Sequence, residues 1–395
     1  LLLTIIQTDP KGTGNYIRNI RVIPEPYIDS CESLIFNPDF IDKIKPYKVL
    51  RFMDWMVTNN SEQGQWHQRP KMADSTYFAQ GVPVEIMVAL ANQTGINPWF
   101  NMPHQATDEY VQNFAQYVKE NLNPYSKVYV EFSNEVWNRR FQQSAYAIEQ
   151  GKQEWPDSEA RDRALGVDWY SQRTTEITQI WDNVFDTDKE RVIGVMSAQA
   201  ANPAVAHRAL QYAWASEVKT HPEYGIDAIA IAPYFGGYIG RPDNAAEVES
   251  WTTDPDGGLN KLFEEMTTGG VLSNGPFGGT LRLACERITQ HLELAKQHSL
   301  ELITYEGGQH LVGVGSTVNN QAIANLLITA NRDPRMGNVY REYLAIWKNL
   351  GLGLFVHYTD IGRPSKWGSW GALETIYQDA SPKYDALIEF SATKV

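Results

Sequence analysis

The sequence holds 395 residues, enough for one large domain or two of average size, and its 43% hydrophobic and 21% charged residues are ordinary for a globular protein. A formal net charge of −13 argues against a nucleic-acid backbone or an anionic membrane as the partner, because both attract a basic surface. The aromatic fraction is high at 12%, with 12 Trp and 20 Tyr, which suits either a cleft that stacks on sugar rings or a large core.

The N-terminal stretch, residues 1–17, differs in pattern from the rest of the chain. Its apolar run is too short for a signal peptide, and it predicts two strands around a Lys-Gly-Thr-Gly turn. We interpret residues 1–17 as the possible tail of an upstream β module, and residues 18–395 as one domain. No apolar run in the sequence reaches the length of a membrane span.

Cysteine and histidine give no sign of a metal site. Cys31 and Cys285 are too few for a disulfide framework or a zinc ribbon, and two small buried thiols are favoured over one bridge. The eight histidines are scattered without a His-x-His pair, which a metal-dependent barrel hydrolase would need. We therefore expect neither a metal nor a cofactor.

Eight apolar, strand-like runs alternate with helix-like segments along the chain. The predicted strands are 18–24, 48–55, 83–92, 127–135, 191–198, 227–234, 301–308 and 352–360. The predicted helices are 36–47, 106–122, 143–182, 203–217, 281–298, 319–349 and 380–390. Asn37 is the expected N-cap of the first helix, and Thr107 or Asp108 that of the second.

The repeated alternation of strand and helix predicts an α/β fold of the (β/α)₈ TIM barrel type. A doubly wound open sheet is the alternative. Such a sheet normally carries a Gly-rich phosphate turn after its first strand, and none follows residues 18–24. The barrel is therefore favoured.

The longest predicted loop, residues 235–280, follows the sixth predicted strand and is rich in Gly, Pro, Asp and Asn. In a barrel this loop would lie on the face where active sites form, and loops of such length are usually functional or mobile. A peripheral insertion that does not reach a ligand is the alternative.

The fourth predicted strand, within KVYVEFSNEVWN, ends in a glutamate. Val128, Val130 and Phe132 suit the layer against the helices, which turns Glu131 and Glu135 toward the barrel axis. Glu135 comes last, where the strand gives way to a loop, and in a barrel this position indicates catalysis.

The seventh predicted strand, within LITYEGGQH, also closes on a carboxylate, that of Glu306. By the same alternation, Ile303 and Tyr305 would face the helices. Leu302, Thr304 and Glu306 would then face the axis. Two carboxylates at one barrel mouth suit glycosidic cleavage, because one can protonate the leaving oxygen while the other lies beneath the anomeric carbon.

Eight strands, with Asn134 and Glu135 closing the fourth and Tyr305 and Glu306 closing the seventh, make the chain similar to the retaining glycoside hydrolases of clan A. The resemblance covers the chain from about residue 18. It implies that residues 18–395 form a catalytic barrel, that Glu135 is the general acid/base and that Glu306 is the nucleophile.

The resemblance also implies several substrate-binding positions. An Arg on the second strand would lie beside the nucleophile, the Asn before the acid/base would bond the sugar 2-hydroxyl, and an aromatic beyond the eighth strand would floor the subsite at the cleavage point. A His and a Trp just past predicted strands could also reach a sugar, with core packing as the alternative. The candidates are Arg51, Asn134, His104, Tyr234, Trp137, Trp367 and Trp370. The proline usual after the acid/base is replaced by Val136.

The expected function is therefore hydrolysis of a β-linked polysaccharide or oligosaccharide, with retention, through a covalent glycosyl-enzyme. The alternatives are a catalytically inactive carbohydrate-binding barrel, and a transglycosylase or lyase that uses the same carboxylates. We expect a monomer that works outside the cell or in the periplasm, because polymeric substrates lie there. Its partner would be a carbohydrate, not a nucleic acid or a membrane.

Overall fold

The computed structural model describes residues 4–18, 20–212 and 219–393. Its strands are β1 (Val49–Arg51), β2 (Asn97–Met102), β3 (Val128–Phe132), β4 (Val192–Ala198), β5 (Ile226–Ile231) and β6 (Glu301–Thr304). Its helices are α1 (Pro38–Ile44), α2 (Val84–Thr94), α3 (Asp108–Asn121), α4 (Gln142–Glu154), α5 (Asp162–Phe185), α6 (Pro203–Gln211), α7 (Ala245–Trp251), α8 (Leu259–Thr267), α9 (Gly279–Gln297), α10 (Gln321–Arg332), α11 (Pro334–Asn349) and α12 (Pro382–Ala392).

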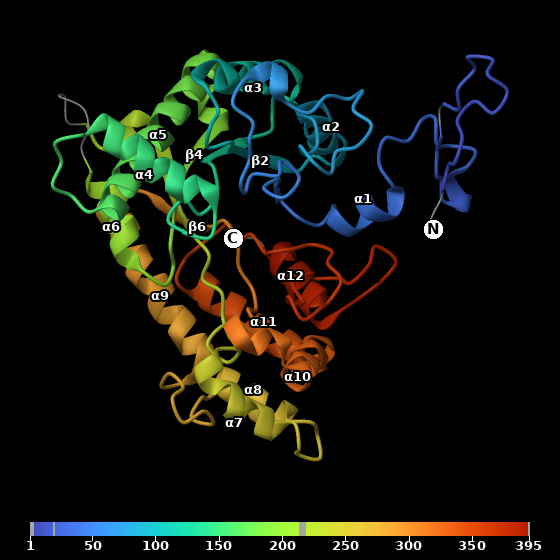
Figure 1. The fold of residues 1–395 in the computed structure, drawn as a ribbon. Coiled ribbons are helices and arrows are strands. Elements are labelled where there is room, and N and C mark those ends of the chain that lie inside the picture. The colour runs from blue at the N-terminus through green and yellow to red at the C-terminus, as the bar shows by residue number, and fades with distance from the viewer. Residues whose placement is uncertain (1–3, 19, 213–218, 394–395) are drawn as a thin grey trace.

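The six strands form one parallel sheet in which neighbours follow chain order from β1 to β6. Helices pack on its outer side, with α2 against β2, α5 against β3 and β4, and α9 against β5 and β6 (Figure 1). Buried apolar residues dominate the strands, as expected where helices cover a parallel sheet. This sequential order is the order that a (β/α)₈ barrel requires.

The sheet curls so far that side chains from the ends of its two outer strands reach each other. Arg51 closes β1, and its Nη1 donates to Oε1 of Glu306, just after β6, over 2.9 Å. In a flat sheet five strand spacings would put these strands roughly 24 Å apart. The strand order and the curl therefore fit a (β/α)₈ barrel.

The predicted eighth strand runs beside β6, but as an irregular segment. The backbone N–H of Thr304 donates to the carbonyl of Leu354 (3.4 Å), and that of Tyr358 donates to the carbonyl of Gly307 (3.1 Å). Between them the Thr304 hydroxyl accepts from the N–H of Val356 and donates to its carbonyl. A side chain thus replaces part of the hydrogen-bond ladder.

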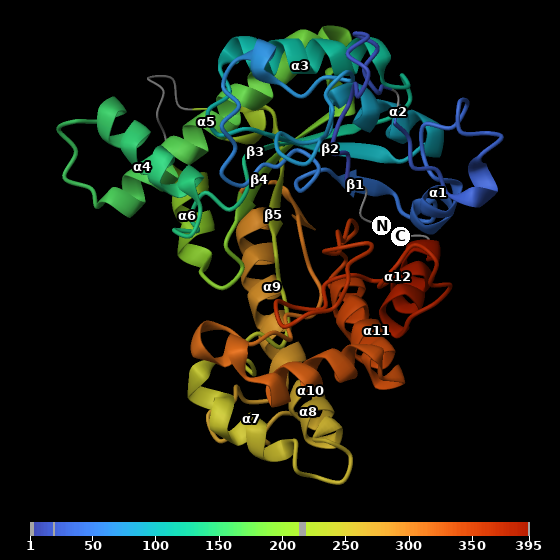
Figure 2. The same cartoon turned by 45° about the vertical axis from the view of Figure 1, so that its right-hand side comes forward.

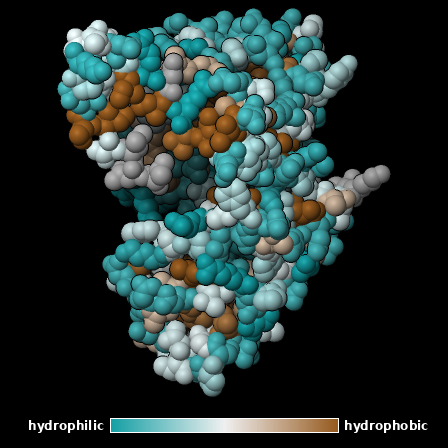
Figure 3. All heavy atoms as spheres, turned by 90° about the vertical axis from the view of Figure 1, so that its right-hand side faces the viewer, coloured by the Kyte–Doolittle hydropathy of each residue, from teal (hydrophilic) through white to brown (hydrophobic). Residues whose placement is uncertain are grey.

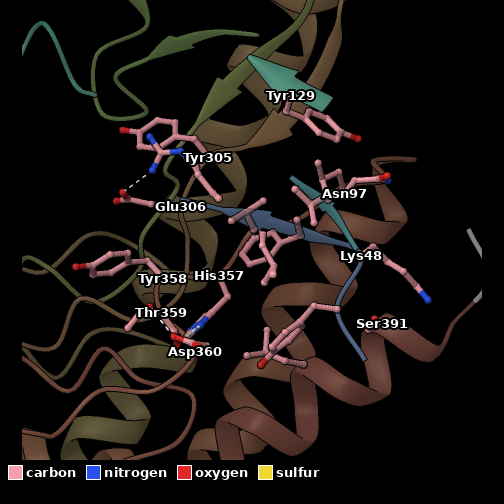
Figure 4. A pocket seen from close by; sticks show the side chains of 18 of the residues that line it. Lys48, Asn97, Tyr129, Tyr305, Glu306, His357, Tyr358, Thr359, Asp360 and Ser391 are labelled. Carbon is pink, nitrogen blue, oxygen red and sulfur yellow. Dashed lines mark hydrogen bonds and ion pairs between the residues drawn. The ribbon is translucent and has the colours of Figure 1, made fainter. Parts of the chain in front are cut away.

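One side of the curled sheet stays open. Among the described residues, no backbone hydrogen bond joins β1 to residues 352–358. A cavity of about 760 Å³ lies between them, lined by Val49, Leu354, Phe355, Phe390 and other residues. Figure 4 shows this cavity, with Glu306 near one end and Lys48 near the other.

The predicted strand at 83–92 is wrong, because this segment is the helix α2. Its buried residues Val84, Met87, Val88 and Ala91 follow helical spacing, and Gly95 ends the helix with a φ of 69°. The strand comes next, as β2, and it was not predicted from the sequence. The strand is almost wholly buried, but its Asn and Pro residues interrupt the apolar pattern by which a buried strand is predicted.

The predicted first strand at 18–24 is also wrong within the described residues, which exclude residue 19. Residues 4–17 likewise form no strand. Instead, the Asp9 carboxylate accepts from the Gly14 N–H and the Thr13 hydroxyl.

Ile6 and Val22 are 95% and 74% exposed, and Figure 3 shows apolar surface beside a hollow on this side of the molecule. The division of the chain at residue 17 stays a prediction.

The loss of the predicted first strand lowers the number of each later strand by one, whereas β2 simply takes the place of the predicted third strand. Glu135 follows β3, the third strand of the structure, and Glu306 follows β6, the sixth. The number of strands between the two glutamates is nevertheless the same as predicted, because β4 and β5 lie where the sequence placed them.

Most of the predicted helices are confirmed, and two of their caps are as expected: Asn37 accepts from the N–H of Asp39, and Thr107 from that of Tyr110. The end of the predicted helix 203–217 is not tested, because residues 213–217 lie outside the described residues. The loop 235–280 contains α7 and α8, which pack near α10 and α9, at the opposite end of the molecule from α3 (Figure 2).

The two cysteines do not form a bridge. Cys31 and Cys285 are both free and only partly buried, so the expectation of two buried thiols is wrong in its burial. No described helix is long and apolar enough to cross a membrane.

Candidate active site

Glu135 is placed by a tight turn directly after β3. Ser133 and Glu135 both have positive φ angles, 56° and 42°, which are unfavourable for residues other than glycine. The N–H of Ser133 still donates to the carbonyl of Met102 at the end of β2. Oε1 of Glu135 accepts from the Tyr305 hydroxyl (2.9 Å), and Oε2 accepts from Nδ2 of Asn138 (2.7 Å). The half-buried carboxylate is therefore fixed at both oxygens.

Glu306 lies just after β6, at the same end of the sheet as Glu135, and we call the space between them the mouth. Glu306 is 8% exposed. Its Oε1 accepts from Nη1 of Arg51 (2.9 Å), and its Oε2 accepts from the Tyr234 hydroxyl (3.0 Å). The backbone turns away at Gly308, whose φ is 121°. A Cβ at Gly308 would lie 2.8 Å from the Tyr340 hydroxyl and from Nε2 of His357, so only glycine fits there.

The pKa of Glu306 depends on several groups at the mouth, and Glu135 is one of them. The pKa of Glu306 is raised to about 7, and burial is the largest cause; the charge of Glu135 also raises it, whereas Arg51 and the Tyr234 hydroxyl lower it. Glu135 also raises the pKa of Tyr305, after burial, which is the largest cause. The charge of Glu135 therefore acts both on Glu306 and on Tyr305, the residue before it in the sequence.

Arg51 is the buried cation beneath these carboxylates. Burial alone would lower its pKa, but Glu131 and Glu306 hold the pKa above its usual value. Nη2 of Arg51 also donates to Oδ1 of Asn134 (2.9 Å). Asn134 in turn donates from Nδ2 to Oδ1 of Asn59 (3.0 Å), which leaves one Nδ2 hydrogen for another acceptor.

Trp370 closes the mouth on the side of Tyr234. Its ring lies 5.8 Å from that of Tyr234, 5.0 Å from that of His310 and 6.0 Å from that of Tyr358. The loop behind it is fixed at the Ser369 carbonyl, which accepts from Gln309 and from the buried Lys383. Trp370 thus lies one aromatic ring away from the carboxylate of Glu306.

Trp367 lies further out on the same loop. Its side chain is 65% exposed, and the Lys366 ammonium lies 4.9 Å from its ring. The Trp367 carbonyl accepts from Nε1 of Trp370 (3.0 Å). Trp367 is therefore free to contact a ligand that extends beyond the mouth.

Two of the sequence-predicted residues lie outside this constellation. His104 packs edge-on against Tyr146 of α4, and burial lowers the pKa of its imidazole to about 4. Trp137 is 6% exposed and packs between Tyr170 and Tyr305. Within the described residues, no hydrogen bond links either side chain to a glutamate of the mouth.

Tyr305 is a site residue whose orientation was predicted wrongly from the sequence. It was expected to face the helices, but its hydroxyl reaches Glu135, and the Arg51 guanidinium lies 5.0 Å from its ring centre. The alternation fails because β6 ends at Thr304, so Tyr305 and Glu306 no longer follow strand geometry. Asn138, three residues after Glu135, was not predicted as a site residue either, and its amide fixes that carboxylate.

The cavity in Figure 4 meets this mouth at Glu306, Tyr305 and Tyr358. The Tyr358 hydroxyl donates to Oδ2 of Asp54 (3.0 Å) at the rim. Within the described part of the chain, no group of three or more His, Cys, Asp or Glu side chains is placed to hold a metal ion. The chemistry available to the mouth is that of two carboxyl groups, a guanidinium and several hydroxyls.

The fold and the mouth define an α/β protein with a carboxylate pair at the carboxyl ends of its parallel strands. No protein-family model matches the chain, and no curated protein matches it. Among solved structures, a Bacteroidetes-affiliated GH5 cellulase linked with a polysaccharide utilization locus has 7% identity and a TM-score of 0.44, over 91% of this chain and 94% of that one.

Two endo-β-1,4-mannanase structures from Thermotoga petrophila are also similar. One has 12% identity and a TM-score of 0.38, over 89% of this chain and 71% of that one. The other, described as hyperthermostable, has 11% identity and a TM-score of 0.35, over 89% and 93%. These similarities are too distant to assign the chain to a family.

Proposed function

We propose that the protein is a retaining glycoside hydrolase that cleaves a β-linked polysaccharide or oligosaccharide. The supporting observation is the meeting of Glu135 and Glu306 at one mouth, where Arg51 and Tyr234 hold the second carboxylate and Tyr305 holds the first. Such a pair supplies the acid and the nucleophile that glycosidic cleavage needs. The β linkage follows from the resemblance to clan A.

In the first step, the ionised Glu306 attacks the anomeric carbon, and Glu135 donates its proton to the departing oxygen. The bond from the carbon to that oxygen breaks as the bond to Glu306 forms. Arg51 and Tyr234 hold the attacking carboxylate through one oxygen each, which fixes its direction. Because burial raises the pKa of Glu306 to about 7, this step requires a pH near or above 7.

In the second step, water attacks the glycosyl-enzyme, and Glu135 takes its proton. Esterified Glu306 carries no charge and no longer competes for the incoming water. Between the two steps Glu135 is a carboxylate, and Asn138 and Tyr305 donate to its oxygens. The product leaves with the configuration of the substrate.

The substrate would lie across the mouth against aromatic rings. Trp370 would form the floor of the subsite at the cleavage point, next to Tyr234 and Glu306, and the exposed Trp367 would contact the next sugar. Asn134 would offer its remaining Nδ2 hydrogen to the sugar 2-hydroxyl. His104 and Trp137 would support the mouth through packing.

The same proposal extends to the scaffold and the location. We take the working enzyme as a (β/α)₈ barrel that is open between β1 and residues 352–358, and the site of action as extracellular or periplasmic, because polymeric substrates lie there. The protein would act as a monomer without a cofactor.

The direct test is release of reducing sugar from a panel of β-glucans, β-mannans, xylans, and sulfated and uronic-acid polysaccharides. The matched control is the double variant E135Q/E306Q, which preserves the shape of both side chains. We expect release by the wild type alone, with the first product observed by NMR in the β configuration. A first product in the α configuration would contradict retention.

The other outcomes identify the alternatives. Binding without release, equal in the wild type and the double variant, would indicate a carbohydrate-binding barrel. Products longer than the substrate would indicate a transglycosylase, and unsaturated products a lyase. Release of reducing sugar from sulfated polysaccharides, without release from uncharged ones, would show that the substrate is a sulfated polysaccharide.

A further inference from the structure

A third carboxylate, that of Glu131 in β3, lies beneath the catalytic mouth and is completely buried. Arg51 donates to it twice, from Nε (2.8 Å) and from Nη2 (3.1 Å). Nε1 of Trp99 (2.9 Å) and Nδ2 of Asn101 (2.8 Å) donate from β2, and the Ser197 hydroxyl (2.6 Å) donates from β4. Glu131 therefore receives five hydrogen bonds, from β1, β2 and β4.

These contacts fix the orientation of Arg51. Two of its nitrogens contact Glu131 in a bidentate pair, which holds the guanidinium plane in one orientation. The remaining nitrogen, Nη1, then points at Glu306. Without Glu131, the long Arg51 side chain would lose its bidentate partner and keep only single hydrogen bonds to Glu306 and Asn134.

Glu131 also determines how much of the Arg51 charge reaches the nucleophile. One buried cation faces two carboxylates, so the group of three carries a net charge of −1 when all are ionised. The negative charge of Glu131, held against Arg51, acts on Glu306 in the direction opposite to that of the guanidinium. Burial then prevails, and the pKa of Glu306 stays raised at about 7 despite a guanidinium at 2.9 Å.

We infer that Glu131 is a positioning residue: its bidentate contact aims Nη1 of Arg51 at Glu306, and its negative charge opposes that of the guanidinium beside the nucleophile. This inference rests on the proposed function for its kinetic consequence, but not for its electrostatic one. The titratable and charged groups that face Glu306 are Arg51, Asp54, Glu135, Tyr234, Tyr305 and Tyr358. Of these, only Arg51 is in contact with Glu131.

The test is the variant E131Q, which keeps the shape of the side chain and removes its charge. Arg51 would then face Glu306 alone, so the pKa of Glu306 would fall. We expect the acid limb of the kcat/KM profile to move from about pH 7 to lower pH by about one unit or more. A lower kcat with an unmoved acid limb would overturn the inference, because a purely structural role would reduce the rate without shifting the limb.

A second measurement does not depend on turnover. With a raised pKa, Glu306 makes the wild type lose stability as pH rises from about 4.5 through about 7. Denaturant unfolding at several pH values should show a smaller loss in E131Q, over a lower pH range. If no glycoside is hydrolysed, this profile still tests the inference, and an unchanged profile would overturn it.

The variant S197A is the matched second substitution. It removes one donor from Glu131 but not the charge, so the carboxylate holds Arg51 more strongly and the pKa of Glu306 rises slightly. We expect a small alkaline shift of the acid limb, opposite in sign to that of E131Q. Should E131Q not fold, S197A decides alone, and an acid shift or no shift would overturn the inference.

Discussion

The two carboxylates that share Arg51 lie in different surroundings. Glu131 is fully buried in the interior of the sheet and accepts hydrogen bonds from four residues on three strands, whereas Glu306, at the mouth, is 8% exposed and accepts from two. A carboxylate with all its lone pairs engaged is held as part of the scaffold. One with lone pairs to spare, next to a cavity, can form a new bond.

The difference also explains the direction of the Glu306 pKa. The donors around Glu131 compensate its burial, but Glu306 has only one cation, already shared, and one hydroxyl. Proximity to an arginine is therefore not sufficient to keep a buried carboxylate acidic, and the partners of that arginine must also be counted.

The largest effect should come from E306Q, which removes the nucleophile and keeps the shape of the side chain. We expect turnover to fall by about 10⁵-fold, because the covalent step cannot occur. Initial rates on the best substrate of the panel would measure it. A fall of less than about tenfold would show that Glu306 is not the reactive member of the two carboxylates on Arg51.

The variant E135A should cost about 10²–10⁴-fold on natural substrates, because the departing oxygen would leave unprotonated. An aryl glycoside with a good leaving group needs no acid, so its first step should stay close to the wild-type rate. Added azide, which needs no base, should then yield a β-glycosyl azide. Equal losses on good and poor leaving groups would argue against the acid/base role.

The variant E131A should lower the free energy of unfolding by about 3–5 kcal/mol, since it leaves the buried Arg51 with one partner fewer and creates a cavity. Denaturant unfolding at pH 7.5 would measure the change. The control S197A, which removes one neutral donor, should cost only about 1 kcal/mol. Similar losses in both variants would contradict a scaffold role for the charge of Glu131.

The variant E306Q should act in the opposite direction and stabilise the fold at neutral and alkaline pH. The folded pKa of about 7 lies above the ordinary value of 4.5, so the fold binds the proton more strongly, and its stability falls as pH rises through this window. Removing the group should recover up to ~3 kcal/mol at pH 8 and little at pH 4. Unfolding curves at the two pH values would measure it, and a loss of stability at pH 8 would contradict the expectation.

The smallest effect should come from Y234F, which removes the hydroxyl that donates to Oε2 of Glu306. We expect kcat/KM to fall by about tenfold, in line with the loss of a hydrogen bond to a charged group. The pKa of Glu306 should rise, so the acid limb should move to higher pH. An acid shift would show that Tyr234 does not stabilise the ionised carboxylate.

The sequence located the carboxylate pair because the pattern that carries it is local. Glu135 and Glu306 each close a short apolar run, and β3, β4 and β5 are buried runs that period and composition predict. The inward direction of Glu131 was also predicted correctly, since Phe132 packs outward on Trp169 of α5.

The sequence failed where periodicity is ambiguous or ends. Residues 83–92 form an apolar run that suits both a strand and a buried helix, and only the helical spacing of Val84, Met87 and Val88 decides between them. Tyr305 was misdirected because alternation was extended one residue beyond β6. The sharing of Arg51 between two carboxylates could not be predicted, since it depends on how the whole sheet curls.

The open side beside β1 gives the ring of strands two free ends. In a closed ring every strand has two neighbours, whereas in the described part of this chain Val49–Arg51 pairs with β2 alone. Local unfolding would therefore begin at β1 and at residues 352–358. In a hydrogen–deuterium exchange experiment, these backbone amides should exchange before those of β3 and β4. The strand that supplies the guanidinium to the reaction is thus one of the two from which we expect local unfolding to start.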